Sequence, residues 1–271
     1  MAMNILFVGG GNMASALIGG LLARGTPAAA IGVIEPSADQ RGALARRFGV
    51  AVHADPGSVA TRADVVILAV KPQQMREAVQ ALRPVLSGQL VVSVAAGVRA
   101  ADLSRWLGGH RRIVRAMPNT PALIGQGATG LAALPGTADA DRQQAEHIMQ
   151  AVGVTVWVDD ETLLDAVTAV SGSGPAYVFR FIEAMIAGGE RLGLSREQAR
   201  ALTLQTFVGA SRLAADSDEE PSVLRERVTS RGGTTAAALA VLDERGLAEH
   251  VSAALDAACR RSAELGREFG S

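Results

Sequence analysis

The chain has little cysteine and few aromatic residues, and both shortages restrict what it can be. Its only cysteine, Cys259, rules out an internal disulfide and is typical of a protein in a reducing compartment. Aromatic residues make up 3% of the 271 residues, whereas 48% are hydrophobic. Ala, Val, Leu and Ile must therefore build the core, which suits closely packed helices and α/β layers.

Strong net charge and long apolar runs are also absent. The formal net charge is −1, so the composition does not favour nucleic acid or an anionic membrane as a partner. The N-terminus lacks the basic segment of a signal peptide, and the apolar stretch 176–194 carries Arg180, Glu183, Glu190 and Arg191. We therefore expect a soluble, cytoplasmic protein without a membrane partner.

The usual signatures of a catalytic base or a metal site are missing as well. Enzymes that transfer hydride to or from alcohols need a His, Lys or Tyr near the nicotinamide. The four histidines stand apart from any motif, Tyr177 has no lysine four residues on, and residues 161–271 contain no lysine. This last absence argues against an enzyme acting on a β-hydroxyacid. No Cys/His cluster indicates a metal, so we expect none.

The first half of the chain alternates short apolar runs with helical patterns. Strands are predicted over residues 4–8, 31–35, 65–70, 90–95 and 112–117, with two more near 127–132 and 155–158. Helices are predicted between the earlier strands, for example over 13–24, 37–48 and 73–82. This alternation predicts an α/β fold with a doubly wound parallel sheet of the Rossmann type, covered on both faces.

No strand pattern follows residue 160. Helices are predicted over 161–170, 175–192, 195–215, 222–228, 234–244 and 247–269. The sequence thus predicts two domains with a boundary near Glu161. The first, residues 1–160, would bind a dinucleotide, and the second, residues 161–271, would be all-helical.

The stretch FVGGGNMA carries the strongest local motif. Gly9, Gly11 and Ala14 match G-x-G-x-x-A between a predicted strand and a predicted helix. Gly9 suits a tight turn, Gly11 lets the backbone approach a pyrophosphate, and Ala14 allows close packing of helix on strand. The helix N-terminus offers free N–H groups to the phosphates. We therefore predict a dinucleotide site.

The residue that ends the second predicted strand bears on the choice of cofactor. Glu35 stands about 20 residues after the fingerprint, where a carboxylate usually binds the ribose 2′-hydroxyl of NAD. Ser37 and Arg41 follow it and could instead meet the 2′-phosphate of NADP. In the alternative interpretation Glu35 is solvated and Ser37 only caps its helix, so NAD and NADP both remain open.

Three later stretches place polar or small residues at predicted strand ends, where open α/β sheets bind their ligands. Lys71 and Pro72 follow one strand, the small residues of 93–98 end another, and Asn119 lies between two prolines. Each has a plainer interpretation: Lys71 as an exposed charge, and Asn119 as part of a structural loop.

Two glycine-containing turns precede predicted helices in the second half. SGSGPAY, residues 171–177, and TSRGGTT, residues 229–235, combine hydroxyl groups with flexible glycines. Exposed N–H groups beside a glycine pair suit a small carboxylate. A helix joint with a threonine cap is the simpler interpretation, and spacing alone does not choose between the two.

Together these stretches resemble the pyrroline-5-carboxylate reductase family. FVGGGNMA, LAVKPQ, SVAAGV, RAMPNTP, SGSGPAY and VTSRGGTTAAAL occur in the family's order and spacing across nearly the whole chain. The resemblance implies reduction of 1-pyrroline-5-carboxylate to L-proline, the last step of proline biosynthesis, by NADPH or alternatively NADH. It also implies a homodimer formed by the helical domain, with further assembly to a decamer.

The resemblance assigns roles to individual residues. Ser230, Gly232, Gly233 and Thr234 would hold the substrate carboxylate, and Thr235 would orient or relay a proton near the imine nitrogen. Ser173 and Asn119 would lie close to the nicotinamide and the substrate. The cofactor would be bound by Gly9, Gly11, Asn12, Met13, Ala14, Glu35, Ser37, Ala69, Lys71, Pro72, Ala95, Ala96 and Gly97.

One residue departs from the family pattern. The family's turn reads S-P-G-G-T, whereas Arg231 occupies the proline position here. Because the proline ring fixes φ, we expect a more mobile loop in this chain. Two other functions stay open: reduction of another small cyclic imino acid, and a non-catalytic dimer that senses NADP.

Overall fold

The chain forms two compact units. The computed structural model describes residues 3–270, apart from the side chain of Ser58. The first unit runs to Ser173 and takes in the chain again from Ala257 onward, and the second is Gly174–Asp256. The chain therefore passes between the units twice, before α7 (Gly174–Arg191) and within α11 (Leu247–Gly270).

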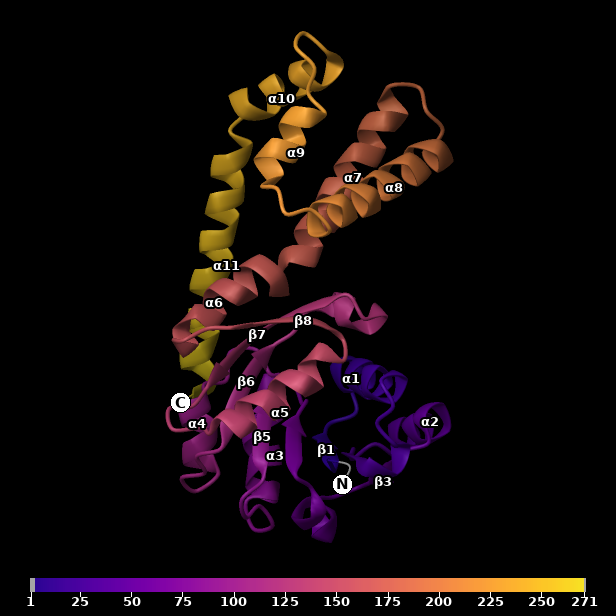
Figure 1. Cartoon of the computed structure of the whole chain (residues 1–271). Coiled ribbons are helices and arrows are strands. Elements are labelled where there is room, and N and C mark those ends of the chain that lie inside the picture. The colour runs from indigo at the N-terminus through magenta and orange to yellow at the C-terminus, as the bar shows by residue number, and fades with distance from the viewer. Residues whose placement is uncertain (1–2, 271) are drawn as a thin grey trace. The chain divides into compact units, whose positions relative to one another are not determined.

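The first unit is built on one eight-stranded sheet, drawn from indigo to magenta in Figure 1. The strand order is β3-β2-β1-β4-β5-β6-β7-β8. The strands are β1 (Ile5–Val8), β2 (Ile31–Ile34), β3 (Ala51–His53), β4 (Val65–Leu68), β5 (Leu90–Ser93), β6 (Ile113–Met117), β7 (Gly127–Ala133) and β8 (Gly153–Trp157). The predicted Rossmann-type sheet is thus confirmed.

One strand pair breaks the predicted parallel pattern. β6 and β7 are antiparallel, whereas every other neighbouring pair is parallel. Only the short 3₁₀ helix η3 (Thr120–Ile124) and its flanking residues join β6 to β7. A parallel crossover needs a dozen or more residues, usually with a helix, so the short connection turns the chain back on itself.

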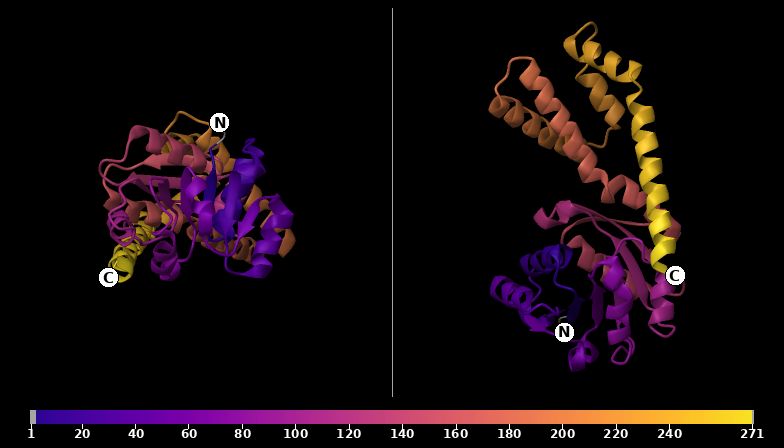
Figure 2. Two further views of the ribbon diagram at one scale, coloured as in Figure 1. Left: turned by 90° about the horizontal axis from the view of Figure 1, so that it is seen from below. Right: turned by 180° about the vertical axis from the view of Figure 1, so that it is seen from behind.

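Helices cover both faces of the sheet. They are α1 (Asn12–Ala23), α2 (Ala38–Phe48), α3 (Pro72–Leu82), α4 (Ala100–Trp106), α5 (Asp139–Gln150) and α6 (Leu164–Val167), with the π-helical turn η5 (Thr168–Gly172) after α6. Ile5 and Phe7 of β1 face α1, α2 and α5, whereas Leu6 and Val8 face α3, α4 and the end of α11. Figure 2 shows these layers from two further directions. Burial on both faces explains why the strands are continuous apolar runs.

Two features of the first unit differ from the expectation. The sequence does not predict β3 (Ala51–His53), since three partly exposed residues are too few to show a hydrophobic period. The compact unit that contains the sheet extends past Glu161 to Ser173. The reason is that α6 packs on the sheet, where a Cβ on Gly130 of β7 would stand 2.6 Å from Val167.

The second unit consists of helices, as predicted. It contains α7, α8 (Arg196–Ala215), α9 (Pro221–Arg227), α10 (Thr234–Glu244) and the first part of α11. A capping box, whose Ser-x-x-Gln spacing is visible in the sequence, opens α8. The Ser195 hydroxyl accepts from the backbone N–H of Gln198, and the Gln198 amide oxygen accepts from that of Ser195. Among the described residues, no helix is both long enough and apolar enough to cross a bilayer.

The second unit has almost no core of its own. Within 174–256 only Ala199 and Thr203 are buried. Large apolar side chains are exposed instead, among them Phe179 at 60%, Leu202 at 60% and Val208 at 63%. An apolar surface of this extent is typical of a unit that a partner covers.

Candidate active site

The fingerprint turn joins β1 to α1 at the carboxyl edge of the sheet. Gly9 has φ +97°, and a Cβ there would stand 2.8 Å from the carbonyl oxygen of Ala69, so the turn needs glycine at this position. Ala14 is fully buried against the sheet. Nothing lies within 4 Å of a Cβ built on Gly11, which leaves open space beside the backbone. The three positions have the properties that the motif predicts.

The N-terminus of α1 is left open for an anion. Gly11 is the N-cap and contributes no side-chain hydrogen bond, and the first turn contains no acidic residue. Asn12 is exposed and Met13 is half-buried. The first N–H groups of a helix have no partner within it, so this end suits the pyrophosphate of a dinucleotide.

Glu35 braces the fingerprint turn. One carboxylate oxygen accepts from the backbone N–H of Gly10 at 3.0 Å and the other from that of Ser37 at 2.9 Å. The side-chain amide of Gln40 donates to the carbonyl oxygen of Gly10 at 2.8 Å. Glu35 is therefore half-buried and engaged in two hydrogen bonds, and Gln40 is a supporting residue that the sequence does not reveal.

Ser37 and Arg41 stand beside this brace. The Ser37 hydroxyl accepts from the backbone N–H of Gln40 at 3.4 Å, so Ser37 caps α2, which was one of its two interpretations. The Arg41 guanidinium donates to the carbonyl oxygens of Glu35 and Pro36, both at 2.7 Å. A hydroxyl group and a guanidinium thus lie where the ribose of a bound adenosine is expected.

The ends of β4 and β5 lie on the other side of the fingerprint turn. Ala69 and Pro72 are half-buried there, and Lys71 is exposed at the N-cap of α3. Ala95 and Gly97 are buried after β5, with Ala96 between them half-buried. Gly97 has φ +76°, and a Cβ there would stand 3.1 Å from the Phe269 ring at the end of α11.

Asn119 holds a loop together at the end of β6. Its amide oxygen accepts from the backbone N–H of Ala128 at 2.9 Å, and its amide nitrogen donates to the carbonyl oxygen of Ser171 at 3.0 Å. The side chain thus ties β7 to the π-helical turn that leads to Ser173. Ser173 is half-buried, and its backbone N–H donates to the carbonyl oxygen of Thr168 at 2.8 Å.

The turn before α10 is a second open helix N-terminus. The backbone N–H of Gly233 donates to the carbonyl oxygen of Ser230 at 3.0 Å, and Gly232 has φ +72°. The N-cap is Gly233, and no side chain caps the helix, so the threonine cap is not formed. Thr234 is exposed and Thr235 is half-buried. This turn belongs to the second unit, whereas the other site residues belong to the first.

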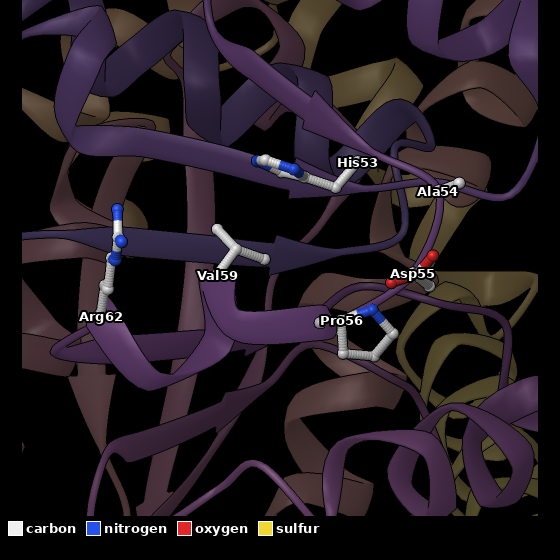
Figure 3. A pocket seen from close by; sticks show the side chains of 7 residues that line it. His53, Ala54, Asp55, Pro56, Val59 and Arg62 are labelled. Atoms are coloured by element: carbon white, nitrogen blue, oxygen red, sulfur yellow. The ribbon is translucent and has the colours of Figure 1, made fainter.

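A pocket of about 340 Å³ opens at the end of β3 (Figure 3). It is lined by His53, Ala54, Asp55, Pro56, Gly57, Val59 and Arg62, none of which the sequence marks as a site. β3 borders β2, so the pocket lies toward the strand that Glu35 directly follows. In the described part of the chain, no three His, Cys, Asp or Glu side chains are grouped to hold a metal.

The fold and the fingerprint turn define a Rossmann-type dinucleotide-binding protein. Residues 161–265 match the model of the pyrroline-5-carboxylate reductase dimerisation domain, and residues 4–97 match that of the coenzyme F420-dependent NADP oxidoreductases. The pyrroline-5-carboxylate reductase of Pseudomonas aeruginosa is 51% identical over 98% of both chains.

Solved structures agree with this sequence relative. The chain matches a pyrroline-5-carboxylate reductase from Coxiella burnetii with TM-score 0.94 and 42% identity, over 98% of this chain and 99% of that one. It matches the NADP-bound enzyme from Plasmodium falciparum with TM-score 0.85 and 30% identity, over 97% and 98% of the two chains. The chain belongs to the pyrroline-5-carboxylate reductase family. The predicted family and enzyme class are confirmed.

Proposed function

We propose that the chain reduces 1-pyrroline-5-carboxylate to L-proline with NADPH, and with NADH as a second cofactor. The turn of residues 230–233 carries the proposal, because it leaves the N-terminus of α10 without a side-chain cap beside two glycines. The first turn of α10 contains no acidic residue that would repel a carboxylate. Family membership supplies the substrate class.

The substrate explains why a strong protein base is missing. When bound, the reduced nicotinamide supplies a hydride to the C=N carbon, and the imine nitrogen ends with a proton. A cyclic imine is basic enough to carry that proton, so the protein mainly has to align two partners. We assign Ser230, Gly232, Gly233 and Thr234 to the carboxylate, and Thr235 to orienting or relaying the proton.

The dinucleotide contacts are assigned from the open end of α1 outward. Gly9, Gly11, Asn12, Met13 and Ala14 meet or shape the pyrophosphate site, and Ser37 lies on the adenosine side beside Glu35. Ala69, Lys71, Pro72, Ala95, Ala96 and Gly97 line the path toward the nicotinamide, with Asn119 and Ser173 at its far end. Asn119 acts there by holding the loop, since both ends of its amide are bonded within the chain.

NADPH is proposed as the preferred cofactor because of the groups around Glu35. Two backbone N–H groups already bind its carboxylate, which leaves it less free to accept from a ribose 2′-hydroxyl, as the carboxylate of an NAD site does. The exposed Ser37 hydroxyl and the Arg41 guanidinium are suitable phosphate partners. The relative from Plasmodium falciparum was solved with NADP bound.

One assay tests the function and the cofactor together. Purified protein is mixed with pyrroline-5-carboxylate and either NADPH or NADH, and oxidation is followed at the nicotinamide absorbance. We expect turnover with both and a higher kcat/KM with NADPH. Absence of oxidation with either cofactor would overturn the function, and a higher kcat/KM with NADH would overturn only the cofactor preference.

The second unit supports self-association. Its helices expose Phe179, Leu202 and Val208 and bury almost nothing. We propose that residues 161–271 form a homodimer and hold the substrate, that residues 1–160 bind the dinucleotide, and that dimers assemble to a decamer in the cytoplasm. Sedimentation at the mass of a monomer would refute the dimer. Sedimentation at the mass of a dimer would refute the decamer.

A further inference from the structure

A partly buried ion pair, in which the Arg99 side chain is 24% exposed, lies outside the residues assigned above. Asp165 of α6 accepts from the Arg99 guanidinium at 2.7 Å, and its other oxygen accepts from the Ser262 hydroxyl of α11 at 2.7 Å. The Asp165 side chain is 10% exposed. Ser262 lies 97 positions later in the sequence, so Asp165 joins two distant parts of the first unit.

A second, partly buried ion pair joins β6 to Glu161, which lies just before α6. The Arg115 guanidinium of β6 donates to the Glu161 carboxylate at 2.7 Å, and its side chain is 5% exposed. Burial lowers the pKa of Arg115, and the facing Glu161 carboxylate opposes that effect. The same Glu161 oxygen accepts from the backbone N–H of Ala100 at 2.7 Å. The side chain of Arg99, the N-cap residue of α4, does not cap this helix.

The two pairs adjoin the segments at the ends of β5 and β6. Arg99 follows Gly97 by two residues, and Gly97 packs on Phe269. α11 approaches Arg99 closely, since a Cβ on Gly266 would stand 3.1 Å from the Arg99 guanidinium. Asp165 lies in the helix that continues into the π-helical turn, whose Ser171 carbonyl is bonded to Asn119. Removing the pairs would therefore free both segments.

A gain in folding stability alone does not explain why the chain contains these two partly buried ion pairs. The desolvation of two buried charges offsets most of their attraction, and apolar side chains of the same volume often stabilise as well. The pairs instead fix geometry. A guanidinium and a carboxylate bind in few relative orientations, so the pairs hold the elements that carry them in one arrangement. The segments that they hold are those proposed to line the nicotinamide path.

We propose that Asp165 and Glu161 are positioning residues for the nicotinamide half of the dinucleotide site. The proposal rests on the proposed function, which places the pyrophosphate at β1 and the adenosine toward β2. The nicotinamide then falls on the side of β4, β5 and β6. Asp165 and Glu161 act there through α4, the 95–97 turn and the π-helical turn, without touching the cofactor.

Two ligands that differ by the nicotinamide half test this assignment. In Asp165→Asn the dissociation constant for NADPH is expected to rise about tenfold, because the nicotinamide path loosens. The dissociation constant for 2′,5′-ADP, which lacks the nicotinamide half, is expected to stay within about twofold of the wild type. Turnover is expected to fall about 10- to 100-fold, as for a small misplacement of reacting groups. Ser262→Ala keeps both charges and is expected to shift the same quantities less.

Asp141→Asn is the matched control. The Asp141 side chain is 4% exposed and forms an ion pair with Arg112 at 2.6 Å. Arg112 directly precedes β6, so this pair lies at the edge of the sheet opposite the proposed nicotinamide path. Its loss is expected to lower thermal stability without changing the ratio of the two dissociation constants or the turnover of folded protein.

Each outcome has one meaning. Equal weakening of NADPH and 2′,5′-ADP in Asp165→Asn, or an effect that Asp141→Asn matches, would overturn the positioning role. If Asp165→Asn does not fold, Ser262→Ala decides by the same two ligands. A wild-type protein that binds NADPH but shows no turnover would overturn the proposed function and leave this binding test intact.

Discussion

Single alanine substitutions at Gly9, Gly11 and Gly25 separate what the fold requires from what the cofactor site requires. At Gly9 φ is +97°, and an added Cβ would stand 2.8 Å from the carbonyl oxygen of Ala69 and 2.9 Å from Val70. At Gly11 φ is −69°, and nothing lies within 4 Å of an added Cβ. Gly25 has φ +90° with open space around its Cβ, so it isolates the backbone effect.

These geometries predict how much folding free energy each of the three alanine variants loses. Left-handed backbone costs a residue with a Cβ about 1–2 kcal/mol, which is the expected loss for Gly25→Ala. Overpacking adds about 1–3 kcal/mol, so Gly9→Ala is expected to lose about 2–5 kcal/mol. At the N-cap, Gly11→Ala is expected to lose less than about 1 kcal/mol. For a chain of this size, the loss for Gly9→Ala lowers the unfolding midpoint by roughly 10 °C.

Binding should follow a different order. Gly11→Ala places a methyl group where the backbone must approach the pyrophosphate, so we expect the Kd for NADPH to rise at least about tenfold. Gly25→Ala should bind as the wild type does. Thermal unfolding and fluorescence titration with NADPH measure the two effects. Normal binding by folded Gly11→Ala would refute the placement of the pyrophosphate, and equal stability of Gly9→Ala and Gly25→Ala would refute the clash.

Three further outcomes are expected. Thr235→Val should lower turnover about 100-fold while NADPH binding persists, as loss of a proton-transfer group would; a parallel loss of binding would show that Thr235 is misassigned. Arg231→Pro should raise the unfolding free energy by about 0.4–1 kcal/mol, since Gly232 at φ +72° completes a turn that favours proline before it; chemical denaturation that finds a loss would contradict this. Burial lowers the pKa of His110 below its ordinary value of about 6.5. The unfolded chain then binds more protons, so stability should fall as pH drops below about 6.5, and His110→Gln should flatten that slope in urea titrations.

The elements that local pattern governs were predictable. The capping box of Ser195 and Gln198 needs only residues three positions apart, and the structure contains it. The fingerprint turn likewise depends on neighbours: Gly9 has the required positive φ, and Ala14 is buried. Where a local rule failed, a distant group had intervened. Gln40 has the spacing of a capping box with Ser37, yet its amide bonds to the carbonyl oxygen of Gly10.

Long-range contacts decided what spacing left open. Asn119 between two prolines could have aimed its amide at a ligand, but Ala128 and Ser171 bind both ends of it. Glu35 could have been without a partner in the chain, but it braces the fingerprint turn. A single sequence does not reveal the hydrogen-bond partners of Asn119 or Glu35. Those partners lie on other segments, and no local sequence pattern connects segments that meet only in the fold.

The sequence by itself determined most of the order of strands and helices, the dinucleotide fingerprint and the family, because these depend on residue type and on short fixed spacings. Only the tertiary structure decided that β7 runs against β6, that Asp165 binds Arg99 and Ser262, and that the second unit is nearly without a core. These features arise when surfaces far apart in the chain meet, and the free energy that selects them is spread over contacts that leave no mark on neighbouring residues.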